Sequence, residues 1–352
     1  MAVGKGRPIK KIEDKKQAAD RQSLLLKLAG FREMGIVFFL VALVTVISLR
    51  SPIFFTLDNI YDIGLDVAIL AIVAVGQMMV IMTRGIDISV GTGIGLSGMV
   101  VALILQSNQG ISPVVAILIG LAVGAVMGSL NGILIVKGKI PPIMATLGTM
   151  SIFRGLTFII NYWINGGKWI GADKLSDAFK NFARGAALLI PNLILITVIV
   201  YAIFYYFLNH TTTGREMYAV GSNPDSAKVI GINTDKIIFL TYLITGMLVG
   251  MGGVLWVSRY SSAQTDSAVG FEFTVITAVV LGGVAISGGT GTIFGVLLGS
   301  VLIGVINNSL NLIRISPFWK LAINGLIILL AVIVDKLVSE KTNEILLERR
   351  KL

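Results

Sequence analysis

Few side chains in this sequence could carry out covalent chemistry. His210 is the single histidine, cysteine is absent, and no Gly-x-x-x-x-Gly-Lys-Ser/Thr segment is present to hold the phosphates of a nucleotide. No nucleophile stands beside a base, and no cluster has the spacing of metal ligands. We therefore expect no catalytic residue, no metal and no cofactor in the chain, and an enzyme is disfavoured.

Polar side chains inside long apolar stretches are better functional candidates. Burying them in lipid costs free energy unless they pair with each other or line a path. Asn and Gln both donate and accept hydrogen bonds, which suits a neutral hydroxylated solute, whereas fixed charge is sparse. For the amides, hydrogen bonding between helices is the alternative role. The candidate path residues are Gln77, Asn131, Arg154, Glu272, Asn308 and Asn324.

Two arginines suggest specific ion pairs. Arg154 is a fixed charge in an apolar stretch, and we expect it to pair with Glu272 or Asp87. Arg84 is close enough to Asp87 in sequence for a local ion pair that would hold a glycine-rich turn, a structural role that we favour over ligand contact. The expected turn residues are Arg84, Gly85, Asp87, Ser89 and Gly91.

The elements that position these residues are membrane helices. Of the 352 residues, 55% are hydrophobic and 14% charged, and the mean hydropathy is +0.87, as in a polytopic membrane protein. We expect an all-α fold with about ten transmembrane helices, the run over 271–286 being short enough for a partial crossing. The apolar runs lie at 34–49, 63–83, 88–106, 113–136, 143–163, 188–208, 237–258, 271–286, 291–311 and 318–335.

The basic residues indicate topology. The net charge is +10, and the Lys and Arg residues gather beside alternate ends of the apolar runs, which disfavours nucleic acid as a partner and predicts that both termini are cytoplasmic. We expect a basic arm with an interfacial helix over 1–33, a transmembrane domain over 34–336 and a charged tail over 337–352. The first apolar run is expected to be retained rather than cleaved as a signal peptide.

Glycine spacing and one internal similarity bear on helix packing. Gly120, Gly124, Gly128 and Gly132 recur every fourth residue, which lets helix backbones approach closely in lipid. The segment over 85–93 is similar to that over 283–291, so an architecture of two related halves is possible.

Two polar segments interrupt the apolar runs. The one over 164–187 is expected outside the membrane, with Leu175, Ala178, Phe179 and Phe182 forming the buried face of a helix lying on the membrane or docking an external partner. The other, Gly214–Lys236, is expected in the cytoplasm.

Gly214–Lys236 predicts a short helix that offers contact to a cytoplasmic partner. Pro224 and Asp225 suit its first turn, and Gly231 suits its end. Ala227, Val229 and Ile230 are expected to form its apolar face.

Three motifs in order carry a resemblance to a known family. GIDISVG at 85–91, the polar segment Gly214–Lys236 and the segment over 278–300 together resemble the membrane-spanning permease subunits of bacterial ABC importers of the ribose and monosaccharide group. That group includes rhamnose-type and autoinducer-2 permeases, and GGKWI at 166–170 is similar to a segment of those two types. The resemblance runs from about residue 35 to 336.

The resemblance implies partners that the residues do not show. It implies a dimer with a second permease subunit, identical or different, a cytoplasmic ATPase that holds ATP and Mg, an extracytoplasmic sugar-binding protein, and a place in the bacterial inner (cytoplasmic) membrane. The polar segment would then be the coupling loop that inserts into the ATPase. Its matching positions are Gly214, Arg215, Asn223, Pro224, Asp225, Ala227, Lys228 and Gly231.

The expected function is inward transport of a monosaccharide or a similar small neutral solute, of ribose, rhamnose or autoinducer-2 type, driven by the separate ATPase. A stand-alone secondary carrier or channel is the main alternative, although proton coupling would need intramembrane carboxylates and few are present. A membrane receptor or scaffold is the third class.

Overall fold

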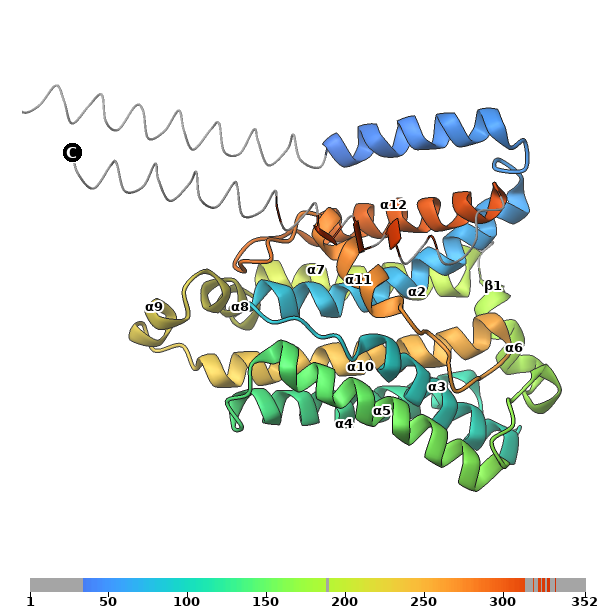
Figure 1. Ribbon diagram of the computed structural model, residues 1–352, viewed down its shortest axis with the longest axis horizontal. Coiled ribbons are helices and arrows are strands. Elements are labelled where there is room, and N and C mark those ends of the chain that lie inside the picture. The colour runs from blue at the N-terminus through green and yellow to red at the C-terminus, as the bar shows by residue number, and fades with distance from the viewer. Residues whose placement is uncertain are drawn as a thin grey trace, which may run out of the picture.

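The computed structural model describes residues 34–187 and 190–313, with single positions between 319 and 333. The described chain is a helical bundle (Figure 1). A hairpin of two-residue strands, β1 (Ala186–Ala187) and β2 (Ile190–Pro191), interrupts it. After a first helix, Met34–Arg50, the helices are α2 (Leu57–Met82), α3 (Val90–Ser107), α4 (Pro113–Val136), α5 (Pro142–Asn165), the 3-10 turn η1 (Ala172–Lys174), α6 (Asp177–Arg184), α7 (Asn192–His210), α8 (Thr212–Ser222), α9 (Pro224–Val229), α10 (Thr234–Tyr260), α11 (Phe271–Leu281) and α12 (Ile293–Leu312).

The all-α polytopic fold predicted from composition is confirmed. Among the described residues, seven helices are long and apolar enough to cross a membrane, and Met34–Arg50 and α11 are shorter apolar helices. The last of the ten expected runs, 318–335, falls largely outside the described residues. With 11 residues, α11 rises only about 16 Å, roughly half of the hydrocarbon thickness, so the shortness expected of this run is confirmed, and a partial crossing stays a prediction.

The bundle has two ends, which we name by the short helices that mark them. At the α9 end, α8 and α9 connect the last residues of α7 to the first of α10; at the α6 end, α6 lies beside the last turn of α10 (Figure 1). The basic arm over 1–33 and the tail over 337–352 lie outside the described residues. Which end faces the cytoplasm stays a prediction from charge.

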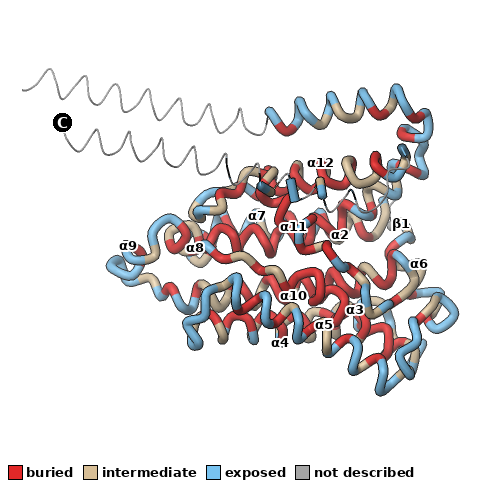
Figure 2. Tube along the Cα trace, viewed as in Figure 1, coloured by how far each residue is buried: buried red, intermediate tan, exposed pale blue. Residues whose placement is uncertain are grey.

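Helix α2 is the centre of the bundle rather than a lipid-facing helix. Its most apolar window is 94% buried, against 28% in α4, α5 and α7. Figure 2 shows buried positions concentrated along α2, α3 and α10, and exposed ones on the outer helices. An all-round apolar sequence in α2 therefore reflects burial in protein on every side.

The close helix contact predicted from the glycines spaced by four is confirmed, and the helix that α4 contacts through them is α10. Gly124 faces Gly246 and Gly250: a Cβ at Gly124 would lie 2.9 Å from the Gly250 Cα, and one at Gly246 would lie 2.6 Å from the Gly128 Cα. Real Cβ atoms do not approach backbone so closely, so the contact requires glycine on both helices.

The helix expected over part of 164–187 forms, but its burial differs from the prediction. Phe179 and Leu175 are 0% and 3% exposed and pack with Met99 and Val257 in a cluster of the chain's own core, while Ala178 is exposed. The Ser258 hydroxyl also donates to the Phe179 carbonyl at 2.6 Å. The expectation of a face buried in the membrane was wrong, because α10 supplies a protein surface that the sequence pattern does not reveal.

Candidate functional site

The polar segment Gly214–Lys236 folds into two short helices and a cap. Asn223 ends α8, and its side-chain oxygen accepts hydrogen bonds from the backbone N–H groups of Asp225 and Ser226, both at 3.0 Å. Pro224 occupies the first position of α9, where a missing N–H costs nothing. Gly231 follows with a left-handed φ of 88°. The predicted helix is confirmed, and α8, a second helix in front of it, was not predicted.

The apolar residues of α9 divide between two surroundings. Ala227 is 2% exposed and packs on the core of the chain, whereas Val229 and Ile230 are 86% and 73% exposed. The predicted shared face is therefore wrong. Consequently, Ala227→Asp would bury a carboxylate inside the chain, and Val229 and Ile230 are the apolar side chains that a partner can reach.

Residues 83–89 form the segment between α2 and α3. Within it, Arg84 makes hydrogen bonds to the end of α8. Its Nε donates to the Gly221 carbonyl at 2.6 Å and its Nη2 donates to the Ser222 carbonyl. Among the described ion pairs there is none between Arg84 and Asp87. The predicted local pair was wrong, because the unpaired carbonyls at the end of α8 lie within reach of the guanidinium.

The segment between α11 and α12, residues 282–292, completes this junction. The Gly289 N–H donates to the Met82 carbonyl at 2.8 Å, and the Tyr218 hydroxyl of α8 donates to the Gly291 carbonyl at 3.0 Å. Burial raises the pKa of the Tyr218 phenol, which keeps its proton available for that bond. We call these contacts, centred on Arg84, Gly221 and Gly289, the α8 junction.

The α8 junction also places the segment over 283–291 against the residues just before the similar segment over 85–93, since a Cβ at Gly288 would lie 2.5 Å from the Arg84 side chain. The architecture of two related halves stays a prediction.

We expect Arg84→Met to lower transport without unfolding the chain. The substitution leaves the Gly221 and Ser222 carbonyls without a donor, and each unsatisfied group costs about 1–3 kcal/mol if no water replaces it. In an ATP-driven importer of the kind that the motifs resemble, solute uptake should fall several-fold, and Arg84→Lys should restore part of it. Uptake and melting temperature are measured on the same preparations. Unchanged uptake with Arg84→Met would show that the α8 junction transmits nothing.

A buried polar network lies where α3 begins. The Asp87 carboxylate accepts from the Ser89 N–H at 2.8 Å and from the Ser89 hydroxyl at 2.6 Å. Asn131 of α4 donates to the Ser89 hydroxyl at 3.0 Å and accepts from the Thr149 hydroxyl of α5 at 2.7 Å. With its amide oriented to satisfy both atoms, Gln77 pairs with the backbone N–H and carbonyl of Asp87 at 3.3 Å.

This network joins four segments of the bundle. Gln77, Asp87 and Asn131 are each at most 3% exposed. Their hydrogen bonds are those expected of amides that hold helices together. A role of Gln77 and Asn131 in translocation stays a prediction.

Close packing beside this network leaves no room for a side chain at Gly85 or Gly91. A Cβ at Gly85 would lie 3.3 Å from the Tyr242 ring carbon that carries the hydroxyl, and one at Gly91 would lie 2.7 Å from the Ala268 carbonyl oxygen. The expected turn residues thus lie in one compact region, although the partner expected for Arg84 is replaced.

Arg154 bonds to backbone rather than to a carboxylate. Its Nη1 donates to the carbonyls of Thr265 and Ser267 at 2.6 and 3.2 Å, and no described ion pair joins it to Glu272 or Asp87. The predicted pairing is therefore absent. Glu272 is 4% exposed, packs beside Gly91, and has an Oε2 with no hydrogen-bond partner among the described residues.

The two remaining path candidates lie near the α6 end or outside the described residues. Asn308 of α12 donates to the Asn59 side-chain oxygen of α2 at 2.9 Å. Asn324 is not among the described residues. No group of three or more metal-binding side chains occurs in the described part of the chain.

One polar site at the α6 end was missed. Arg259 donates to Asp62 at 2.8 Å and lies 3.4 Å from Asp66, which also accepts from the Tyr260 hydroxyl at 3.1 Å. The sequence signal was available: Asp62 and Asp66 are four residues apart and share one helix face. Their partner, almost 200 residues away, could not be found from spacing.

Comparison with known proteins agrees with the resemblance found in the motifs. A family model described as "Branched-chain amino acid transport system / permease component" matches residues 59–332. No solved structure matches the chain at a significant level.

The curated relatives cover most of the chain. The ribose import permease protein of Escherichia coli (strain K12) is 38% identical over 297 residues, which are 84% of this chain and 91% of that protein. That of Bacillus subtilis (strain 168) is 39% identical over 294 residues, 84% and 89% of the two chains. The galactose/methyl galactoside import permease protein of Escherichia coli (strain K12) is 33% identical over 334 residues, 91% and 98% of the two chains. The chain therefore belongs to this family of membrane-spanning transport permeases.

Proposed function

We propose that the chain is the membrane-spanning subunit of an ABC importer that moves a monosaccharide into a bacterial cell, driven by a separate ATPase. The observation that carries the proposal is α9, a capped helix with Val229 and Ile230 exposed, held to the rest of the bundle through the α8 junction. Relatives named as importers of ribose and galactose support the solute class.

In this proposal the α9 end faces the cytoplasm, as the basic residues indicate. Val229 and Ile230 insert into a cleft of the ATPase, and Lys228 and Asp225 lie beside them in water. A second permease subunit pairs with this chain, and an extracytoplasmic sugar-binding protein delivers the solute to the α6 end. ATP and Mg bind in the ATPase alone.

The α8 junction offers a route for the movement. Closure of the ATPase shifts α9 and α8 together, because Asn223 caps the first and ends the second. Arg84 and Gly289 then pass the shift to the residues before α3 and before α12. Two packed arrangements of these segments would open the path to one side or the other.

Reconstituted transport tests the proposal. The chain is placed in liposomes with a candidate ATPase and a candidate sugar-binding protein from the same organism, and uptake of radiolabelled D-ribose, D-allose and D-galactose is followed with and without ATP. Uptake of at least one sugar that needs all three components and ATP is expected. Flux through the chain without the ATPase would instead indicate a secondary carrier or channel, and no flux under any condition would favour a receptor.

A further inference from the structure

A polar cavity of about 330 Å³ lies at the α6 end, away from the buried network and the α8 junction. Three parts of the chain form it: the last turns of α5, the glycine-rich turn after α5, and the segment between α10 and α11, residues 261–270. Its lining residues are Asn161, Gly167, Trp169, Gln264, Thr265 and Asp266.

Hydrogen bonds join the turn after α5 to the 261–270 segment across the cavity. Ile170, next to Trp169, exchanges two backbone hydrogen bonds with Ala263, next to Gln264, at 3.0 and 2.9 Å. From the middle of α5, Arg154 donates hydrogen bonds to the carbonyls of Thr265 and Ser267. These contacts hold the 261–270 segment, which is mostly turns, in place, so the cavity is preformed.

The turn that carries Trp169 is also defined by its residues. Gly166 and Gly167 have left-handed φ values of 64° and 75°, which favour glycine. The Asn165 side chain donates to the Lys168 carbonyl at 2.7 Å and accepts from Gln106 of α3 at 3.1 Å. Trp169 is thereby held at the cavity while its side chain remains 66% exposed.

The lining has the chemistry that a sugar requires. A flat indole offers an apolar surface to the C–H face of a sugar ring, and its exposed state leaves that surface free. Asp266 supplies a strong acceptor, and Gln264, which is also exposed, supplies a donor and an acceptor for hydroxyl groups. Asn161 is 1% exposed and its side-chain oxygen accepts from the Asn165 amide at 3.4 Å, so it can offer only its own N–H group. No lysine or arginine lines the cavity to attract an anionic solute.

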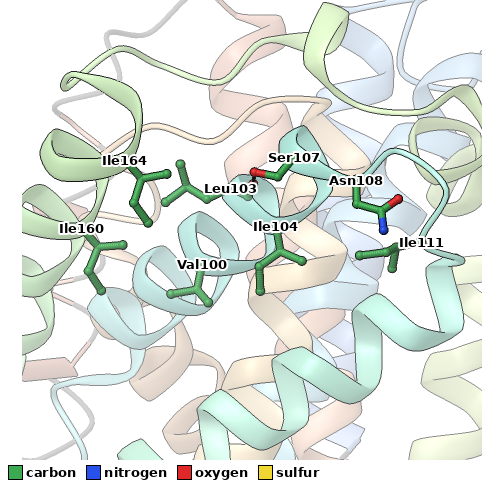
Figure 3. A pocket seen from close by; sticks show the side chains of 8 residues that line it. All are labelled: Val100, Leu103, Ile104, Ser107, Asn108, Ile111, Ile160 and Ile164. Carbon is green, nitrogen blue, oxygen red and sulfur yellow. Dashed lines mark hydrogen bonds between the residues drawn. The ribbon is translucent and has the colours of Figure 1, made fainter.

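A neighbouring groove has an apolar lining, in contrast to the polar lining of this cavity. Figure 3 shows a pocket between α3 and α5 whose lining is mostly Val, Leu and Ile, including Ile160 and Ile164 of α5. Asn161 lies between those two in sequence but about 100° from Ile160 around the helix. One face of α5 thus suits lipid or protein, and another suits a hydroxylated solute.

We propose that this cavity is an entry subsite that binds a neutral monosaccharide on the outer side, with Trp169 stacking on the ring and Asp266 accepting from its hydroxyls. The inference rests on the proposed transport function and deepens it. The 261–270 segment leads from the subsite to α11 and packs on α3, since a Cβ at Gly95 would lie 3.1 Å from the Ser267 carbonyl oxygen. Sugar in the subsite therefore contacts a segment that continues towards Glu272 and Gly91.

Binding is measured without partner proteins. The full chain in lipid nanodiscs is titrated with D-ribose, D-allose and D-galactose, and saturation transfer from protein to sugar protons is recorded by NMR. We expect at least one sugar to bind with a millimolar Kd, as one open pocket allows. Trp169→Ala should weaken that binding about tenfold, and Asp266→Asn several-fold.

Matched controls separate the subsite from general effects. Trp163→Ala removes another exposed tryptophan near the end of α5 that does not line the cavity, and Asp173→Asn removes an exposed carboxylate of the same external region. Both should bind sugar as the unmodified chain does. Size-exclusion profiles and melting temperatures confirm that all four variants are folded.

Three results would overturn the subsite. The first is that the unmodified chain binds no sugar up to about 50 mM, which is far above the expected Kd. The second is that sugar binding is unchanged in both Trp169→Ala and Asp266→Asn. The third is that the two control variants lose as much sugar binding as these two variants do. ATP-driven uptake by the complete complex is measured separately. If Trp169→Ala lowers uptake in a chain that binds no sugar, the cavity instead contacts the sugar-binding protein.

Discussion

Gly246→Leu is expected to prevent the chain from folding into its bundle. Gly246 faces α4 so closely that even a Cβ would lie 2.6 Å from the Gly128 Cα, and the three further carbons of leucine have no space. Either α4 and α10 must separate or the backbone must bend. Inserting carbons into packed regions usually costs about 1–3 kcal/mol, and here rigid backbone on both sides should raise the loss of folding free energy to about 3 kcal/mol or more.

Gly155→Leu is the matched control for this prediction. Gly155 is also in the middle of an apolar helix, α5, but a Cβ there would meet no atom within 4 Å. Fluorescence-detected size exclusion and thermal melting of both variants in detergent provide the measurement. We expect a monodisperse peak with Gly155→Leu and aggregated or absent protein with Gly246→Leu. Equal melting temperatures would mean that the α4–α10 contact is not as close as the structure has it.

The double variant Val229→Asp, Ile230→Asp is expected to abolish ATP-driven uptake while leaving the chain folded. Both side chains are largely exposed in the chain alone, so the carboxylates remain in water and folding is unaffected. In an ATPase cleft, however, each charge would be desolvated without a partner, which costs several kcal/mol. Because about 1.4 kcal/mol corresponds to tenfold, uptake should fall by at least about a hundredfold.

The exchange variant Val229→Ile, Ile230→Val keeps the apolar surface and should transport normally. Uptake in proteoliposomes and co-purification of the ATPase with each variant are measured together. Loss of both in the aspartate variant alone supports insertion of α9 into the ATPase. Normal uptake by the aspartate variant would remove these two side chains from the coupling mechanism.

The features predicted correctly from sequence are those that depend on nearby residues. Apolar runs of about 20 residues predicted the long helices, because a crossing requires that length. Pro224, Asp225 and Gly231 predicted where α9 begins and ends, since a first-turn proline, a first-turn carboxylate and a left-handed glycine act within a few positions. The shortness of the run over 271–286 predicted that α11 would be a short helix.

The two corrections that concern arginines share one cause. Arg84 was expected to pair with Asp87, three residues away, but binds carbonyls 137 and 138 residues away. Arg154 was expected to find a carboxylate, but binds the backbone of the 261–270 segment. In both cases a carbonyl oxygen, present at every residue and invisible in a pattern of side chains, was the partner.

The sequence by itself determined that this protein is a helical membrane protein with a polar segment suited to a partner outside the membrane, because hydropathy and capping are local properties. The tertiary structure alone decided which apolar residues of α9 and α6 are buried. It also decided that Trp169 and Asp266, almost 100 residues apart, line one cavity. The physical reason is that burial and long-range hydrogen bonds depend on which helices pack together, and every apolar helix surface looks alike until its neighbour is in place.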